Sequence, residues 1–115
     1  MRFSFWSLCL AVVLVVALLA TAPAFSQVGR AAITGIITDG TGAVIPGVAV
    51  KATHVATGVV YEGTTNEVGS YNISALPVGV YSVTFSASGF KTLVREGINL
   101  SAGQIARLDM TMEVG

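Results

Sequence analysis

The sequence predicts an all-β domain, a seven-stranded sandwich or small barrel, behind an apolar N-terminal leader. Val, Ile and Thr make up 30 of residues 27–115, whereas Leu occurs only four times there. Such β-branched side chains favour strands over helices. All 13 glycines follow the leader and separate the apolar runs, as turn signals do between short strands. No 11-residue window free of glycine keeps the i, i+3, i+4 apolar spacing of a helix.

The leader has the three parts of a secretory signal peptide. Arg2 supplies the positive start, and residues 8–20 form an uninterrupted apolar run. Ala22 and Ala24, or Ala24 and Ser26, place small residues at positions −3 and −1 of a cleavage site, and we expect cleavage after Ser26. The 53% hydrophobic content then divides into 20 apolar residues in the leader and 41 in the remaining 89, an ordinary share for a globular domain. The predicted organisation is a signal peptide at residues 1–26, a spacer at 27–30 and a β-sandwich domain at 31–115.

An uncleaved membrane anchor is the alternative reading of the leader. The 13-residue run would reach only about 20 Å as a helix, against a hydrocarbon core of about 30 Å. Counting from Phe3 lengthens the apolar stretch, so the alternative stays open. Cys9 begins the run, whereas a lipidated cysteine would follow it. Cleavage would remove Cys9 and leave no cysteine for a disulfide, a thiolate zinc site or a nucleophile.

The predicted strands lie between glycine-rich turns and show the alternation of half-buried strands. Within residues 48–55, Val48, Val50 and Ala52 share one face. The longest central strand, residues 81–86, alternates aromatic or valine side chains with Ser and Thr. In order, the seven strands are expected at residues 31–38, 48–55, 59–65, 71–74, 81–86, 92–100 and 106–113.

Three glycine or tyrosine positions have a predicted conformational role. Gly69 precedes Tyr71 in a turn that favours positive φ. Gly97 interrupts the sixth strand and indicates a β-bulge. Tyr81 follows Leu-Pro-Val-Gly, and we expect its ring to be buried while its hydroxyl bonds nearby backbone, as in a tyrosine corner.

Five segments, in one order and at one spacing, resemble the carboxypeptidase regulatory-like domain family. Together they extend over about residues 31–112. They are Gly35–Asp39, Gly42–Val50, Thr65–Tyr71, Leu76–Val83 and Ser88–Phe90. The resemblance implies a transthyretin-like Greek-key sandwich, also described as immunoglobulin-like, found beside zinc carboxypeptidase domains and in bacterial surface proteins.

The order of leader, spacer and domain is similar to the N-terminus of TonB-dependent outer-membrane receptors. In those receptors a plug and a transmembrane barrel follow, whereas this sequence ends with Glu113-Val114-Gly115. The resemblance therefore implies a fragment or truncated form, or a domain that stands alone. It implies export to the periplasm or outer membrane of a Gram-negative bacterium. Membrane association is expected only through a barrel missing from this sequence or through an uncleaved leader.

The resemblance implies a non-catalytic accessory domain that binds a protein partner or a glycan on the periplasmic side or the cell surface. The alternative is a freestanding secreted carbohydrate-binding or adhesion module. A small hydrolase is the least favoured possibility, because the hydroxyisourate hydrolases of this fold need several histidines and a Tyr-Arg-Gly-Ser terminus. Six basic and six acidic residues balance, which gives no electrostatic footprint for nucleic acid.

No catalytic, cofactor-binding or metal-binding residue is assigned from the sequence. His54 is the sole histidine, and we expect a solvated residue at a strand end. Glu62 and Glu67 are the nearest candidates for a carboxylate pair, with solvated positions as the simpler interpretation. Asp39, Asn66 and Glu67 would bind calcium only if their turns converged, and no calcium-loop spacing supports this.

Binding features are equally unspecific in the sequence. Asn72 and Asn99 begin N-glycosylation sequons, which are irrelevant in a bacterium. Phe90 is a candidate for sugar stacking, but packing over the sandwich edge is the favoured interpretation. Pairing through an edge strand is a general route to a protein partner, although no residue is singled out for it.

Overall fold

The computed structural model describes residues 5–19 and 29–115. Helix α1, Phe5–Leu19, contains no charged residue, and the side chains of residues 6–17 are exposed. Within the described residues, no helix combines the length and apolar content needed to span a membrane. The predicted cleavage site after Ser26, its small residues and Arg2 lie outside the described residues.

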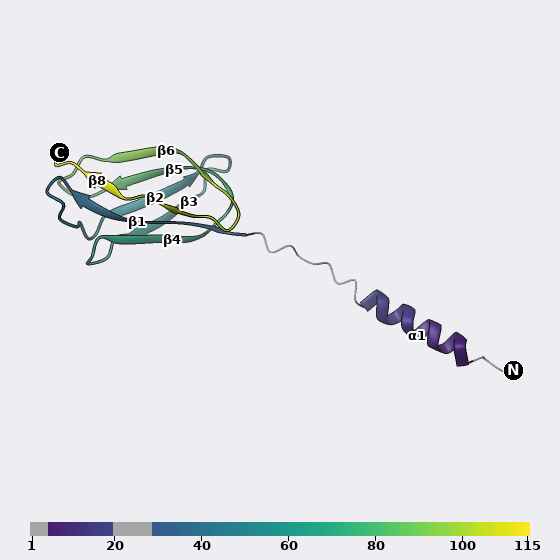
Figure 1. Ribbon diagram of the computed structural model, residues 1–115. Coiled ribbons are helices and arrows are strands. Elements are labelled where there is room, and N and C mark those ends of the chain that lie inside the picture. The colour runs from purple at the N-terminus through teal and green to yellow at the C-terminus, as the bar shows by residue number, and fades with distance from the viewer. Residues whose placement is uncertain (1–4, 20–28) are drawn as a thin grey trace.

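Residues 29–115 form eight strands in two layers, which Figure 1 shows as a sandwich. The strands are β1 (Ala31–Asp39), β2 (Ala49–His54), β3 (Val60–Thr64), β4 (Ser70–Leu76), β5 (Gly79–Ser86), β6 (Leu93–Leu100), β7 (Ile105–Arg107) and β8 (Met110–Met112). One sheet has the order β4-β1-β7, with β8 also paired to β1, and the other has the order β3-β2-β5-β6. The predicted all-β sandwich is confirmed.

The two sheets differ in strand direction. The second sheet is antiparallel throughout, and it contains the hairpins β2–β3 and β5–β6. In the first sheet β1 runs antiparallel to β4 but parallel to both β7 and β8. The first and last strands of the sandwich are therefore direct neighbours that point the same way.

The predicted count of seven strands is wrong, because the strand expected at residues 106–113 is divided into β7 and β8. At the division Leu108 N donates to Thr34 O, and Ile36 N donates to a side-chain oxygen of Asp109 instead of a backbone carbonyl. This side-chain acceptor interrupts the ladder along β1. The predicted alternation survives, since Leu108 and Met112 are less exposed than their neighbours on either side.

The core lies between the sheets and consists of the alternate residues that the sequence indicates. Val50 and Ala52 of β2 are fully buried, as are the three large inward side chains of β5. The rings of Tyr71 and Phe85 meet edge to face, with centroids 5.8 Å apart. Because these two rings come from opposite sheets, this contact joins the two layers.

Positive φ angles occur where the strands turn or bulge. Gly69 has φ +73°, as predicted, and Gly97 has φ +72°. The β5–β6 register advances two residues from Tyr81 to Val83 but three on β6, so Gly97 lies in a bulge. A similar shift in β4 contains Ala75, whose φ is +58°.

Candidate functional site

His54 is buried at the end of β2, with 8% of its surface exposed. The predicted solvated position is therefore wrong. The reason is the strand alternation itself, which places His54 on the same inward face as Val50 and Ala52. Its ring packs edge to face on Tyr81, at a centroid distance of 5.1 Å.

Both ring nitrogens of His54 have partners within the domain. Nε2 lies 3.0 Å from Val78 O, and Nδ1 lies 2.9 Å from Thr57 Oγ1. Because a carbonyl only accepts, Nε2 carries the proton, and in the neutral ring Nδ1 accepts from the threonine hydroxyl. A ring bonded on both sides and buried holds the β2–β3 turn in place and has no free nitrogen for a substrate or metal.

Asp39 and Asn66 use their side-chain oxygens to close turns. Asp39 Oδ1 accepts from Thr41 N, from the Thr41 hydroxyl and from Ala43 N. These hydrogen bonds, the Thr41 hydroxyl first, lower the pKa of Asp39. Asn66 Oδ1 accepts from Val68 N and Ser70 N. The two turns are thus closed locally.

The other carboxylates are spread over the surface. Glu62 faces Lys51 across the β2–β3 ladder, with Oε1 3.9 Å from Nζ, and Glu67 is exposed in the turn before β4. Over residues 5–19 and 29–115, no three His, Cys, Asp or Glu side chains gather as metal ligands. The side-chain oxygens of Asp39 and Asn66, which were candidates for calcium binding, instead accept hydrogen bonds within their own turns.

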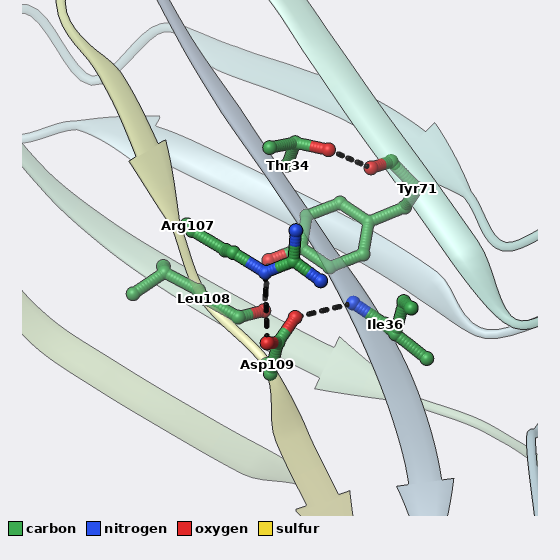
Figure 2. Close-up of polar contacts among 6 residues, drawn as sticks. All are labelled: Thr34, Ile36, Tyr71, Arg107, Leu108 and Asp109. Carbon is green, nitrogen blue, oxygen red and sulfur yellow. Dashed lines mark hydrogen bonds and ion pairs between the residues drawn. The ribbon is translucent and has the colours of Figure 1, made fainter.

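A cluster of hydrogen-bonded side chains and backbone groups lies where β7 passes into β8 (Figure 2). Tyr71 OH donates to Leu108 O at 2.7 Å, and Thr34 Oγ1 donates to Tyr71 O at 3.0 Å. Asp109 accepts from Ile36 N at 2.8 Å and from Arg107 Nε at 2.9 Å. These bonds tie β7 and the segment between β7 and β8 to β1 and β4.

The charges at this junction stabilise one another. The hydrogen bond from Arg107, followed by that from the Ile36 amide, lowers the pKa of Asp109. The same pair raises the pKa of Arg107. Burial raises the pKa of the Tyr71 hydroxyl, and the Asp109 charge adds to this. The junction therefore holds a neutral phenol beside an ion pair and has a structural role.

Glycine is required beside this junction. A Cβ on Gly35 would lie 2.0 Å from Leu108 O and 2.6 Å from its carbonyl carbon. Any side chain at this position would displace the segment between β7 and β8. Gly35 opens one of the segments on which the family resemblance is based, and this close approach gives its physical reason.

Phe90 is half-buried and packs against the core, as the favoured interpretation predicted. It forms an isolated bridge with Val114, and Lys91 N donates to Glu113 O beside it. A shallow cleft of about 250 Å³ lies between the start of β6 and β8. Its lining is Lys91, Thr92, Leu93, Thr111, Met112 and Glu113.

The family model of the carboxypeptidase regulatory-like domain matches residues 32–113. This chain belongs to that family. The match contains all eight strands except the first residue of β1. No curated protein has a sequence that matches the chain.

Solved structures that resemble this carboxypeptidase regulatory-like domain share its fold at low identity. The Bacillus anthracis TIE protein aligns with TM-score 0.63 and 20% identity over 75% of this chain. A type II Cohesin-X-Dockerin complex from Acetivibrio cellulolyticus aligns with TM-score 0.61 and 20% identity over 74%. Chlorocatechol 1,2-dioxygenase from Pseudomonas putida aligns with TM-score 0.59 and 14% identity over 74%. The chain spans 17%, 58% and 60% of those three chains, respectively.

Two structural residues of this carboxypeptidase regulatory-like domain were not singled out from its sequence. Thr65 is buried, and its hydroxyl donates to Ile45 O and accepts from Val48 N. Asp109 provides the side-chain acceptor that divides the last strand. A lone polar residue in a strand pattern is the only sequence signal for either, and it does not tell a buried position from an exposed one.

The remaining candidates lie on the surface. The sequon residues Asn72 and Asn99 are both exposed. Among residues 29–115, by contrast, Tyr61 and Phe90 are half-buried and the other Tyr and Phe side chains are buried. The accessible surface of the domain is instead rich in valine, serine and threonine.

Proposed function

We propose that this carboxypeptidase regulatory-like domain is an exported, non-catalytic binding domain that contacts a protein partner. The observation that carries the proposal is the burial and hydrogen bonding of the sole histidine. His54 is buried with both ring nitrogens bonded, so it cannot reach a substrate as general acid or base. Asp39 and Asp109 accept backbone hydrogen bonds in turns and ladders. These polar side chains thus stabilise the fold, and we assign binding to the exposed surface of the domain.

A protein partner is favoured over a glycan because of the aromatic side chains. Proteins commonly bind sugars on flat aromatic side chains that keep one face open, whereas every aromatic ring of residues 29–115 is half-buried or buried. Its exposed strands instead offer β-branched side chains and backbone groups, which suit another polypeptide. A glycan array with the purified protein tests this choice. Specific glycan binding would favour the alternative, a secreted carbohydrate-binding or adhesion module.

Export is the second part of the proposal, with the periplasm or outer membrane of a Gram-negative bacterium as the destination. It is supported by the apolar helix α1 and by the small residues that follow it in the sequence. The test is expression of the complete sequence in a Gram-negative host, followed by fractionation and mass measurement. We expect periplasmic protein that begins at Gln27. A cytoplasmic product of the full 11.8 kDa would contradict export.

The third part is the context of a TonB-dependent receptor, in which the domain would be an N-terminal extension. It is supported by the order of leader, spacer and domain. The DNA that follows the Gly115 codon tests it directly. An in-frame plug and barrel would support the receptor context, and a stop codon would refute it in favour of a domain that stands alone.

A further inference from the structure

The outer edge of β3 is one of the two terminal edges of the second sheet, and β6 forms the other. The side chains of Val60, Glu62 and Thr64 are exposed in alternation along it. The bonds at the two ends of β3 set its hydrogen-bond pattern, since His54 N donates to Val59 O and Thr65 N donates to Val48 O. Both pairs belong to the continuous β2–β3 register.

This pattern determines which backbone groups of β3 are free. In an antiparallel pair, residues bonded to the neighbouring strand alternate with residues whose N–H and C=O point away from it. Tyr61 and Gly63 fall in the first group with Val59 and Thr65. Val60, Glu62 and Thr64 consequently direct their backbone groups away from β2, toward the open edge.

The edges on the opposite side of the sandwich carry features that prevent strand addition. β6 contains the bulge at Gly97 and the exposed charges of Arg95 and Glu96. The β7–β8 edge is interrupted, and Arg107 and Asp109 lie at the interruption. Bulges, charges and very short strands are the devices by which natural sheets avoid edge pairing.

The edge of β4 is protected in a different way. It contains the bulge at Ala75. The carbonyl oxygen of Asn72 lies 3.8 Å from the position of a Cβ on Gly63, so β3 lies over this part of β4. β3 itself has no register shift with β2 and a single charged residue, which leaves it as the unprotected edge of the four.

The charge of Glu62 indicates the chemistry of a partner strand. Its carboxylate lies 3.9 Å from Lys51 Nζ, with 68% of the Glu62 side chain and 52% of the Lys51 side chain exposed. An ion pair that is this exposed to solvent holds the Glu62 carboxylate only weakly. The carboxylate therefore remains accessible to a second cation. Two copies of β3 paired antiparallel about Glu62 would place carboxylate opposite carboxylate, which is unfavourable.

We propose that the β3 edge docks an extended segment of a partner protein, which adds a fifth strand to the second sheet. The segment places a lysine or arginine opposite Glu62 and β-branched residues beside Val60 and Thr64. The proposal deepens the proposed function, on which it rests for the existence of a protein partner. Backbone bonds supply the affinity of such strand addition, and the side chain opposite Glu62 supplies specificity.

The test uses a defined probe, the peptide TVTVKVTVT, titrated into ¹⁵N-labelled protein produced from the complete sequence. We expect the amide signals of Val60, Glu62 and Thr64 to shift and to gain protection from hydrogen exchange. The signal of Val94 on the β6 edge should not change. The peptide TVTVEVTVT should bind about fivefold more weakly, since a cross-strand charge pair contributes up to about 1 kcal/mol.

Two proline variants provide a matched comparison. Thr64→Pro removes an outward N–H from β3, and Val94→Pro removes an outward N–H from β6, as the β5–β6 register indicates. Proline is tolerated at edge positions whose N–H faces solvent. Thr64→Pro should weaken TVTVKVTVT about tenfold or more, and Val94→Pro should leave its binding unchanged. If Thr64→Pro does not fold, Glu62→Lys serves instead and should reverse the preference between the two peptides.

Several results would overturn the proposal. These are equal binding at β3 and β6, no preference between the peptides, no detectable binding, or self-association through β3 without peptide. The outcome is separate from the test of the proposed function, because peptide binding is measured on purified protein. Exported protein without β3 binding would refute the docking edge alone, and β3 binding by protein that is not exported would refute export alone.

Discussion

Replacing Gly35 with alanine should be the most damaging single-methyl change in the sandwich. The added Cβ would lie 2.0 Å from Leu108 O, so the carbonyl has to move by about 1 Å or more to reach ordinary contact. A shift of that size exceeds the range over which a hydrogen bond keeps its strength.

Three hydrogen bonds depend on the position of this carbonyl and its segment. They are Tyr71 OH to Leu108 O at 2.7 Å, Leu108 N to Thr34 O at 2.8 Å and Ile36 N to Asp109 Oδ1 at 2.8 Å. At about 1 kcal/mol each, with a further penalty for a buried hydroxyl left unpaired, the loss is about 2–4 kcal/mol. Small domains are stable by about 5–15 kcal/mol in total, so the variant loses a large part of its stability.

Urea denaturation followed by circular dichroism measures this loss. Gly40→Ala is the matched control, because a Cβ there meets no atom within 4 Å, and its stability should change by less than about 0.5 kcal/mol. Tyr71→Phe should cost less in the Gly35→Ala background than alone, because the hydroxyl bond is already broken. A Gly35→Ala loss below about 1 kcal/mol, or full additivity with Tyr71→Phe, would refute this account of the junction.

Three further changes test other parts of the fold. Tyr81→Phe removes the 2.6 Å bond from the hydroxyl to Pro77 O and should cost about 1 kcal/mol; equal thermal melting of variant and parent would refute the tyrosine corner. Ala75→Gly should raise the unfolding free energy by about 0.5–1 kcal/mol, because φ is +58° there and glycine adopts this region without penalty, whereas Ala32→Gly in the same sheet should lower it; the reverse order in urea would count against the argument. Burial raises the pKa of Tyr71, so the unfolded chain loses the phenol proton before the folded domain does as pH rises above about 10. The free energy of unfolding should therefore fall above about pH 10, by up to about 1.4 kcal/mol per pH unit. Between about pH 9 and 12 this fall should be shallower in Tyr71→Phe, and an unchanged slope would contradict the argument.

Much of the fold could be predicted because alternation along a strand is a local property. The inward face of β2, the inward face of β5 and the bulge at Gly97 all follow from patterns within a few residues. His54 shows where alternation alone does not decide whether a residue is buried. Its place in the alternation indicates burial, but its polarity favours solvent, and hydrogen bonds from the turns at Thr57 and Val78 decide the outcome.

The division of the last strand could not be predicted for a different reason. It depends on Asp109 meeting Ile36 N across 73 residues of sequence, and no local pattern records which strand lies beside which. The same holds for the β3 edge. β3 is an edge because β2 pairs with β3 on one side and with β5 on the other, and the pairing of β2 with β5 joins strands that are distant in the sequence.

Because the first and last strands pair in parallel, the resistance of the sandwich to pulling should depend on the direction of the force. β1 and β8 point the same way, so the chain enters the sandwich at one end and leaves at the other (Figure 1). A pull between residues 29 and 115 acts along this ladder in shear, and its six partner positions, from Ala32–Ile105 to Asp39–Met112, share the load together. A pull that separates β1 from β4 at Ala31 and Leu76 would break their antiparallel ladder one bond at a time. The domain should thus resist tension between residues 29 and 115 far better than tension that separates Ala31 from Leu76.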